Sequence, residues 1–474
     1  MRIFTPKCGK WTLLGFAIFF VLISIVLIFF TDDIVDAVKD QQFNLGSDDT
    51  MVYGFWEVTP IPLYMNIYLF NWTNPQEVID SKWTIKPSFT QMGPYSFHEK
   101  HYRKHVKFND NHTLTYQTQR IWNFAPERSA GSLDDLVTTI NPVLVTISNI
   151  VKYKHPIAKL AANGLFKERA VTHTVTKTAQ EFIFDGYDDA MFRILKKLRL
   201  RHIKIPYGLK FGWFADRNGS LTYDGTFNMY DGSDDIRKLG RITSWNYDSQ
   251  DHFPSYCGRV NGTSGELFYP VLDDQSVQIF SNDLCSTISL DWEGTQEILD
   301  IEGHKFVIKE KEFDNGTKYP EMACFSPGDV LPNGLRNVTD CYFGAPAFLS
   351  GPHFYLSDPV YRDAIDGMQP DADEHGITVV IEPETGIPLH AKVAMQINLR
   401  VENIERINLL ENAKEYFIPV VWFKEEAEMS DDLGYLISLL LRAPTIGQDT
   451  GFGVLALGCI LFGIFGFIVY NKIW

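Results

Sequence analysis

Two long apolar stretches, one near each end of the chain, constrain its fold more than any other feature. Residues 11–30 carry no charge and are rich in Leu, Ile, Val and Phe, and residues 450–471 are also uncharged. Each stretch is long enough for an α-helix to cross about 30 Å of hydrocarbon. No comparable run lies between them, so we predict two membrane-spanning helices, at residues 11–30 and 450–470.

A cleaved signal peptide is the alternative for the first stretch. Its apolar region would be about 7–15 residues long and would end at small residues. Here the apolar run is longer, and Asp32, Asp33 and Asp36 follow it. The sequence therefore favours a retained anchor.

Flanking charges predict the orientation of both helices. Arg2, Lys7 and Lys10 precede the first stretch, and Lys472 follows the second. Positive charges mark the cytoplasmic side, so we expect both short tails, residues 1–10 and 471–474, in the cytoplasm. Residues 31–449 would then form an extracellular or lumenal ligand-binding domain.

The sequons fit this topology, because all of them lie between the two apolar stretches. An N-x-S/T sequon is a glycosylation site only outside the cytoplasm, and a glycan keeps its Asn at the surface. We predict glycans at Asn71, Asn111, Asn218, Asn261, Asn315 and Asn337.

The cysteines divide into two groups. Cys257, Cys285, Cys324 and Cys341 lie in the predicted ectodomain, where an even number indicates two disulfides in one of three pairings. Zinc is disfavoured, because no C-x-x-C spacing occurs. Cys8, just before the first span, is a candidate for S-palmitoylation.

Composition bounds the class of protein. The chain has 474 residues, of which 45% are hydrophobic, enough for a substantial core. Its net charge of −16 argues against nucleic acid as a partner. There is no internal repeat or long linker, so we expect one large domain between the spans.

The ectodomain is predicted to be mainly β. Residues 389–401 alternate apolar and polar side chains, the pattern of a strand with one buried and one wet face. The β-branched segment 376–382 and the turn Pro383-Glu384-Thr385-Gly386 precede it, which predicts a hairpin. Shorter β-like runs are 113–122, 221–227 and 305–310.

The best helical signals lie in residues 141–186, where a break near residues 162–164 predicts a helical hairpin. Basic residues gather on it and would attract anionic headgroups, oxidised lipids or polyanions through several weak contacts; an ordinary solvated helix face is the alternative. This predicted basic patch consists of Lys152, Lys154, His155, Lys159, Lys167 and Arg169. A denser basic run, residues 193–204, would be either a ligand surface or a lysine-protected edge strand.

Catalytic and metal-binding motifs are weak. His98 and His101 would face opposite sides of a strand, which disfavours shared metal ligation. Asp371 and Glu382 approach the spacing of a calcium loop, but a strand follows where that motif needs a helix, so an acidic surface loop is favoured. We expect no catalytic residue, cofactor or metal site, and therefore no enzyme.

Six segments, taken together and in this order, resemble the class B scavenger receptors, and among them the insect croquemort-like branch. The resemblance covers essentially the whole chain, including both terminal spans. The segments are IPLYMNIYLFNWTNP (61–75), MGPY (92–95), ERSAGSLDD (127–135), FLSGPHFY (348–355), IEPETG (381–386) and IPVVW (418–422).

The resemblance implies a fold and a function. Members of this family have a large antiparallel β-barrel-like ectodomain, an α+β fold with an apical helical bundle, here about residues 134–190. An apolar tunnel runs through the barrel. The pairing implied is Cys257–Cys324 and Cys285–Cys341, with Ser326 where some relatives have an extra cysteine. Lys167 and Arg169 would fall in or near the link between apical helices.

These observations lead to one hypothesis with an alternative. The chain is interpreted as a plasma-membrane scavenger receptor that binds lipids, lipoproteins, anionic particles or apoptotic and microbial debris and promotes their uptake, with lipid passing through the tunnel. The alternative is a lysosomal or endosomal cargo receptor or lipid exporter. Because the tails are short, signalling would need co-receptors.

The second span also carries a face of small residues that predicts close helix packing, within the chain or in a homo-oligomer. These residues recur at three- and four-residue steps: Gly453, Ala456, Cys459, Gly463 and Gly466.

Overall fold

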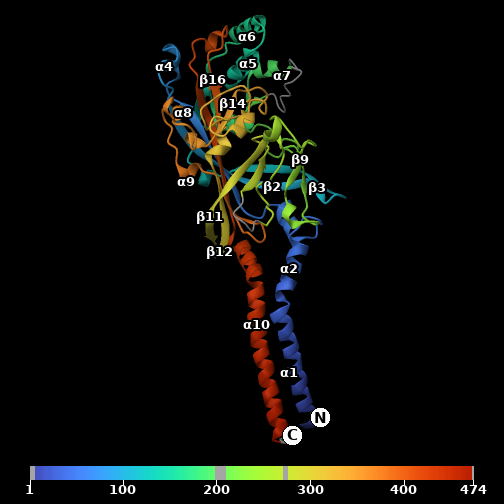
Figure 1. Cartoon of the computed structure of the whole chain (residues 1–474). Coiled ribbons are helices and arrows are strands. Elements are labelled where there is room, and N and C mark those ends of the chain that lie inside the picture. Colours follow the sequence, from blue (N-terminus) through green and yellow to red (C-terminus); the bar gives the residue numbers. More distant parts are fainter. Residues whose placement is uncertain (1–5, 198–209, 271–275, 472–474) are drawn as a thin grey trace. The chain divides into compact units, whose positions relative to one another are not determined.

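The computed structural model describes residues 6–197, 210–270 and 276–471, which form two compact units (Figure 1). The first unit combines the chain up to Asn44, the short segment Leu299–Ile301 and the chain from Ser430 onward. The second unit comprises Leu45–Ile298 and Glu302–Met429.

The first unit contains the two helices that are long and apolar enough to cross a membrane. They are α1 (Pro6–Phe29) and α10 (Asp431–Tyr470), and α2 (Thr31–Gln42) follows α1. α10 begins well before the predicted span, because its 40 residues include the segment 431–449, which carries the charged residues Asp431, Asp432, Arg442 and Asp449, and continue through Pro444.

Glycines of α10 allow it to pack closely against α1. A Cβ atom on Gly451 would lie 2.7 Å from Ile28, and one on Gly458 would lie 2.9 Å from Val21. The predicted small-residue face is therefore not the contact with α1: Gly453, Gly463 and the rest of that face are exposed. Packing within the chain is thus wrong for that face, and its role in a homo-oligomer stays a prediction.

In the second unit, one large antiparallel sheet curls almost into a barrel, as predicted. Its main strand order is β10-β11-β12-β15-β16-β17-β1-β2-β3-β8-β9, and β13 and β14 attach beside β16. The strands are β1 (Leu63–Trp72), β2 (Phe89–Asn109), β3 (Thr113–Phe124), β8 (Thr226–Tyr230), β9 (Ile242–Trp245), β10 (Val277–Ser281), β11 (Ser286–Ile298), β12 (Ile301–Ile308), β13 (Arg336–Asn337), β14 (Ala347–Ser350), β15 (Thr378–Ile381), β16 (Pro388–Val401) and β17 (Tyr416–Glu428).

Two short sheets complete the β structure: β4 (Leu136–Ile140) pairs with β5 (Thr174–Thr178), and β6 (Tyr187–Asp188) pairs with β7 (Lys210–Phe211). Short helices lie in the loops: α3 (Met51–Glu57), α4 (Pro75–Asp80), α8 (Pro359–Asp363) and α9 (Ala372–His375).

The predicted hairpin is confirmed, since β15 pairs antiparallel with β16. The prediction that one face of this strand is exposed to solvent is wrong for the second half of β16, where both faces are buried. Gln396 and Asn398 point to that face and are satisfied there. Gln396 accepts a hydrogen bond from the His353 N–H at 2.7 Å, and the Asn398 amide donates to Ser350 Oγ at 3.0 Å.

The shorter predicted strands are recovered to different extents. The run 113–122 falls within β3, and most of the run 305–310 falls within β12. The run 221–227 is only partly correct, because residues 221–224 form bends and β8 begins only at Thr226.

The helical hairpin exists, but its break lies earlier than predicted. α5 (Pro142–Lys152) is followed by a link at residues 153–155 and then by α6 (Pro156–Glu168). Pro156 starts the second helix with His155 as its N-cap, and Gly164 is accommodated inside it. Lys167 and Arg169 therefore lie at the end of α6, not between two helices.

The helices α5, α6 and α7 (Ala190–Lys197) gather at one end of the second unit, which we call the helical end (Figure 1). Since residues 193–197 are helical, the edge-strand interpretation of the basic run 193–204 is wrong for that part. The rest of the run lies outside the described residues.

Candidate functional site

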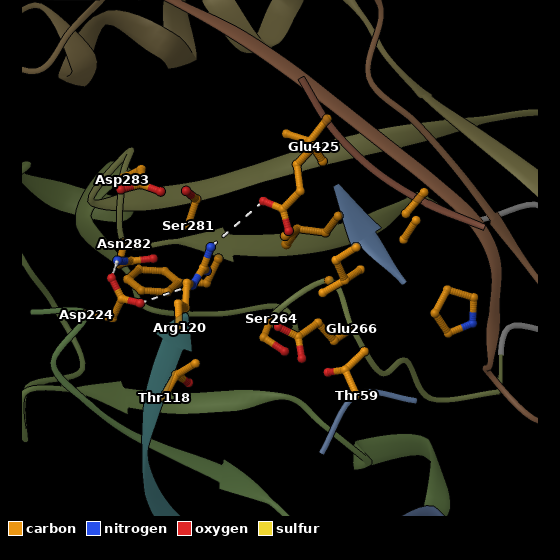
Figure 2. Close-up of a pocket in the computed structure, with 18 of the residues that line it drawn as sticks. Thr59, Thr118, Arg120, Asp224, Ser264, Glu266, Ser281, Asn282, Asp283 and Glu425 are labelled. Carbon is orange, nitrogen blue, oxygen red and sulfur yellow. Dashed lines mark hydrogen bonds and ion pairs between the residues drawn. The ribbon is translucent and has the colours of Figure 1, made fainter. Parts of the chain in front are cut away.

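A cavity of about 170 Å³ lies inside the large sheet (Figure 2). Strands on several sides supply apolar side chains to its wall, among them Leu63 from β1, Ile288 from β11, Met395 from β16 and Phe423 from β17. An apolar space of this kind inside a curled sheet is suited to part of a lipid chain.

Charged side chains cover one part of this wall. Arg120 lies between two carboxylates, with Nε 3.1 Å from Asp224 and Nη1 3.8 Å from Glu425 (Figure 2). Burial alone would raise the pKa of Asp224, but the positive charges of Arg217 and Arg120 outweigh it and hold that pKa below its usual value. Glu425 behaves in the opposite way, because burial and the charge of Glu99 raise its pKa.

Strand β2 supplies a second group of buried charges. Glu99, His101 and Arg103 alternate along it and share one face. His101 Nε2 lies 2.5 Å from Glu99, its Nδ1 lies 2.9 Å from Glu266, and Arg103 also pairs with Glu266. His98, by contrast, packs against the ring of Tyr64. The two histidines of the H-E-x-H segment thus point to different surroundings.

Glu99, His101 and Glu425 come close enough for their ligand atoms to surround an ion, since these atoms lie within 4.8 Å of one another. Arg120 already lies 3.5 Å from Glu99 and supplies a positive charge to both carboxylates. A metal ion would have to displace this guanidinium, so the group is better described as an internal ion-pair network.

Two further cavities continue from the first toward the helical end. The larger, of about 150 Å³, is lined by Thr146 and Ile150 of α5 and by Phe192 of α7. A small one, of about 20 Å³, shares Ile397 with it and shares Met395 with the first cavity. The three cavities therefore have common walls.

The small cavity also has charged side chains in its wall. Arg217 is almost fully buried there, 2.9 Å from Asp224 and 3.0 Å from Asp283. The hydroxyl group of Tyr342 donates to the Asp283 carbonyl oxygen at 2.9 Å. This narrow constriction, with its buried ion pairs, lies between the two larger cavities.

The structure divides the predicted basic patch. Lys154, Lys167 and Arg169 are exposed and Lys159 is half-buried. Lys152 lies 2.6 Å from Glu402 and is paired, and His155 Nδ1 accepts a hydrogen bond from the Ile157 N–H at 3.3 Å. The freely available positive charge is therefore smaller than the sequence suggested and lies around the α5–α6 link and along α6.

Two buried histidines stack beside the sheet. The rings of His353 and His375 lie 4.8 Å apart, and both approach Trp422. His353 Nδ1 accepts from the Gln369 N–H at 3.2 Å, and its Nε2 lies 2.7 Å from Gln91. Burial and the neighbouring His375 lower the pKa of His353 to about 4.

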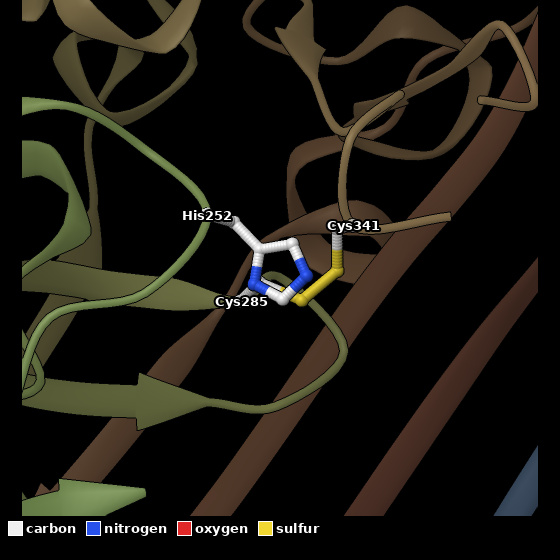
Figure 3. Close-up of side chains that lie close together, drawn as sticks. All are labelled: His252, Cys285 and Cys341. Atoms are coloured by element: carbon white, nitrogen blue, oxygen red, sulfur yellow. A yellow bond between two sulfur atoms is a disulfide. The ribbon is translucent and has the colours of Figure 1, made fainter. Parts of the chain in front are cut away.

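Four cysteines of the second unit form the disulfides Cys257–Cys324 and Cys285–Cys341, the pairing that the resemblance implied. His252 lies against the second disulfide (Figure 3). Because both sulfur atoms are bonded to each other, they offer no thiolate to a metal ion.

The sequons differ in accessibility. Asn111, Asn218 and Asn261 are exposed, and Asn71 and Asn337 are half-buried. Asn315 is only 5% exposed, and its amide group donates to the Pro332 carbonyl oxygen at 3.1 Å. The fold therefore argues against a glycan at Asn315, while glycans at the other five positions stay predictions.

Two remaining segments complete the account of the predicted sites. Asp371 caps the one-turn helix α9. Glu382 is buried and accepts a hydrogen bond from the Glu384 N–H in the following turn. The two carboxylates therefore stabilise different segments of the backbone. Cys8 lies in α1, and its acylation remains a prediction.

Sequence reasoning missed the internal charges and the cavity walls. One signal was present, since Glu99, His101 and Arg103 follow the buried Phe97 at two-residue steps. Such a pattern places charges on the inner face of a strand, but only the register of β2 with its neighbours shows which partners they meet.

Comparisons with known proteins agree with this architecture. A model of the CD36 family matches residues 13–469. The chain is 34% identical over 422 residues to "Protein peste" of Drosophila melanogaster, covering 88% of this chain and 75% of that protein.

Mammalian relatives are also similar over most of their length. Scavenger receptor class B member 1 of Bos taurus is 29% identical, over 94% of this chain and 87% of that protein. Lysosome membrane protein 2 of Rattus norvegicus is 29% identical, over 88% of this chain and 85% of that protein.

Proposed function

Because the chain belongs to the CD36 family, we propose that it is a cell-surface scavenger receptor that binds lipids, lipoproteins, anionic particles or cell debris and promotes their uptake. A relative named scavenger receptor class B member 1 is similar over 94% of this chain, and the match to the family model, residues 13–469, extends over both helices that are long enough to span a membrane.

The observation that carries this proposal furthest is the series of three cavities with common walls. It begins beneath α5 and α7 at the helical end and continues into the sheet. A lipid released from a particle at the helical end would first enter the cavity of about 150 Å³ under α5 and α7. Lipid transfer through the second unit is thus part of the proposal.

The constriction limits such transfer in this conformation. Its volume of about 20 Å³ is close to that of one water position and too small for an acyl chain. Passage would require Trp213, Tyr342 or neighbouring side chains to move, as happens in proteins whose cavities open transiently.

Two measurements test the proposal. The full chain, purified from cells, is expected to carry lipid that mass spectrometry identifies. A Thr146→Trp variant, which fills the cavity under α5, is expected to bind particles normally but to transfer less lipid to cells. Leu136→Trp, at an exposed position of β4, is the control of equal bulk. Undiminished transfer by Thr146→Trp would refute the conduit.

The proposal includes a topology with both termini in the cytoplasm, supported by the positive charges that flank the helices. Protease added to intact cells should then digest the segment between the helices and spare epitope tags at both ends. Digestion of the tags alone would show that the orientation is the opposite of the proposed one.

A lysosomal or endosomal cargo receptor or lipid exporter is the second candidate, favoured by the similarity to lysosome membrane protein 2. Imaging of a tagged full chain separates the two. Surface residence supports the first candidate, and steady-state residence in lysosomes supports the second.

A further inference from the structure

The helical end exposes apolar side chains beside its basic ones. Tyr153 in the α5–α6 link is 85% exposed, and Ile157 and Leu160 in α6 are each 70% exposed. Ile157, Leu160 and Gly164 follow one another at three- and four-residue steps, so they share one face of α6. We call Tyr153, Ile157 and Leu160 the apolar tip.

This face is held outward by packing on the other side of the helix. Phe166 is buried in the second unit. The Asn163 amide donates to the Arg406 carbonyl oxygen at 2.5 Å, and its oxygen accepts from the Asn408 N–H at 3.1 Å. α6 is therefore fixed against the link between β16 and β17, and the apolar tip is a built surface feature.

Positive charge accompanies the apolar tip. Within the part of the chain that the structure describes, Lys154, Lys159 and Lys167 have no ion-pair partner, whereas Lys152 is paired with Glu402 and Arg169 with Glu168. No sequon occurs between Asn111 and Asn218, so no N-linked glycan is attached to the hairpin.

We propose that the apolar tip inserts into the lipid monolayer of a bound particle, while Lys154, Lys159 and Lys167 contact its anionic headgroups. This inference deepens the proposed function and rests on it. A lipid surface offers an apolar layer beneath a charged one, which matches the two kinds of side chain at the helical end. A soluble polyanion offers charge alone.

The test compares these two kinds of ligand. The full chain is reconstituted in nanodiscs of uncharged phosphatidylcholine and is mixed either with vesicles of phosphatidylcholine and phosphatidylserine or with dextran sulfate. The double variant Ile157→Ser/Leu160→Ser is expected to bind the vesicles at least about tenfold more weakly and dextran sulfate equally well. Unchanged dextran sulfate binding also shows that the variant is folded.

The lysine variant should behave differently. Replacing Lys154, Lys159 and Lys167 together by Gln is expected to weaken binding of both ligands and to flatten the dependence of vesicle binding on salt. Tyr153→Ser should weaken vesicle binding, whereas its control Tyr247→Ser, an equally exposed Tyr in the turn after β9, should not.

Unchanged vesicle binding by Ile157→Ser/Leu160→Ser would overturn the inference. If that variant bound vesicles normally but lost uptake in cells, the apolar tip would instead dock a protein. If every variant bound vesicles as expected but even the unmodified chain gave no uptake, the receptor function would fail while insertion would stand.

Discussion

The Nζ atom of Lys152, at the end of α5, lies 2.6 Å from a carboxylate oxygen of Glu402, which directly follows β16. Burial lowers the pKa of Lys152, but hydrogen bonding to Glu402 outweighs it and raises that pKa above its usual value. Both side chains are about four-fifths buried, since 20% and 19% of them are exposed. This lysine of the predicted basic patch therefore joins two elements of the fold.

Lys152 and Lys154 should consequently respond differently to the same substitution. Lys152→Gln is expected to lower the free energy of unfolding by about 1–3 kcal/mol, because it removes a charged hydrogen bond, and to leave dextran sulfate binding unchanged. Lys154→Gln should weaken that binding and leave stability nearly unchanged. Thermal unfolding and binding assays on both variants measure this, and equal loss of binding in both would contradict it.

Glu99 and Glu425 allow a second matched comparison. Burial raises the pKa of Glu425, so its ionised form costs folding free energy, whereas His101 and Arg120 more than offset burial at Glu99 and lower that pKa. At pH 7, Glu425→Gln is therefore expected to be neutral or stabilising. Glu99→Gln should destabilise by on the order of 1–3 kcal/mol, because it removes a buried carboxylate that contacts both His101 and Arg120.

The same pair predicts a pH dependence. A carboxyl group whose pKa is raised by folding lowers the free energy of unfolding as pH rises through its ordinary pKa, because the ionised form is disfavoured in the folded state. Any gain in stability from Glu425→Gln should therefore vanish on acidification toward that ordinary pKa. Denaturant titrations at several pH values measure this. A gain that persists at low pH would show that charge is not its cause.

The stacked pair His353 and His375 should make the fold sensitive to acid. Because folding lowers the pKa of His353 from 6.5 to about 4, the unfolded chain takes up more protons below pH 6.5. Stability from this group is complete above pH 6.5 and is lost as pH falls toward 4, about 2 kcal/mol of it by pH 5. Protonation of Nδ1 would also remove the hydrogen bond that the Gln369 N–H donates to it.

A His353→Gln variant checks this prediction. It is expected to be less stable than the unmodified chain at pH 7 but to lose less additional stability between pH 7 and pH 5. His98→Gln, at a half-buried position of β2, is the control. An unaltered pH profile in His353→Gln would assign the acid sensitivity to other groups.

Two glycines of α10 test the packing of the terminal helices. A side chain on Gly451 would collide with Ile28, whereas nothing lies within 4 Å of a Cβ on Gly463. Gly451→Val is therefore expected to weaken the contact between α1 and α10, to lower the melting temperature in detergent and to reduce surface levels. Gly463→Val should have none of these effects if its face of α10 is free. If that face contacts a second copy of the chain, crosslinking of the full-length protein would detect the contact.

Local patterns predicted the fold where local forces determine it. The hairpin of β15 and β16 follows from β-branched residues around a Pro-Glu-Thr-Gly turn, and both terminal helices follow from their length and lack of charge. The break between α5 and α6 lies just before Pro156 and not near Gly164, where the sequence predicts it. A helix interior tolerates one glycine at modest cost, but proline strongly prefers the first turn.

The internal site depended on contacts that no local pattern contains. Arg120 and Glu425 are far apart in sequence and meet because β3 and β17 both face the same cavity. Likewise, Gln396 looked solvent-exposed by its polarity, yet a backbone group at His353 covers it. Burial of a polar residue is set by what packs against it, which requires the tertiary structure.

The unbroken length of α10 has a mechanical consequence. At 1.5 Å per residue, its 40 residues extend about 60 Å, roughly twice the hydrocarbon thickness of a bilayer. If residues 451–470 occupy the hydrocarbon and the helix stands upright, Asp431 is raised about 30 Å beyond it. The anchor would thus continue beyond the bilayer as a stiff rod, whose length a flexible linker of the same number of residues could not hold constant.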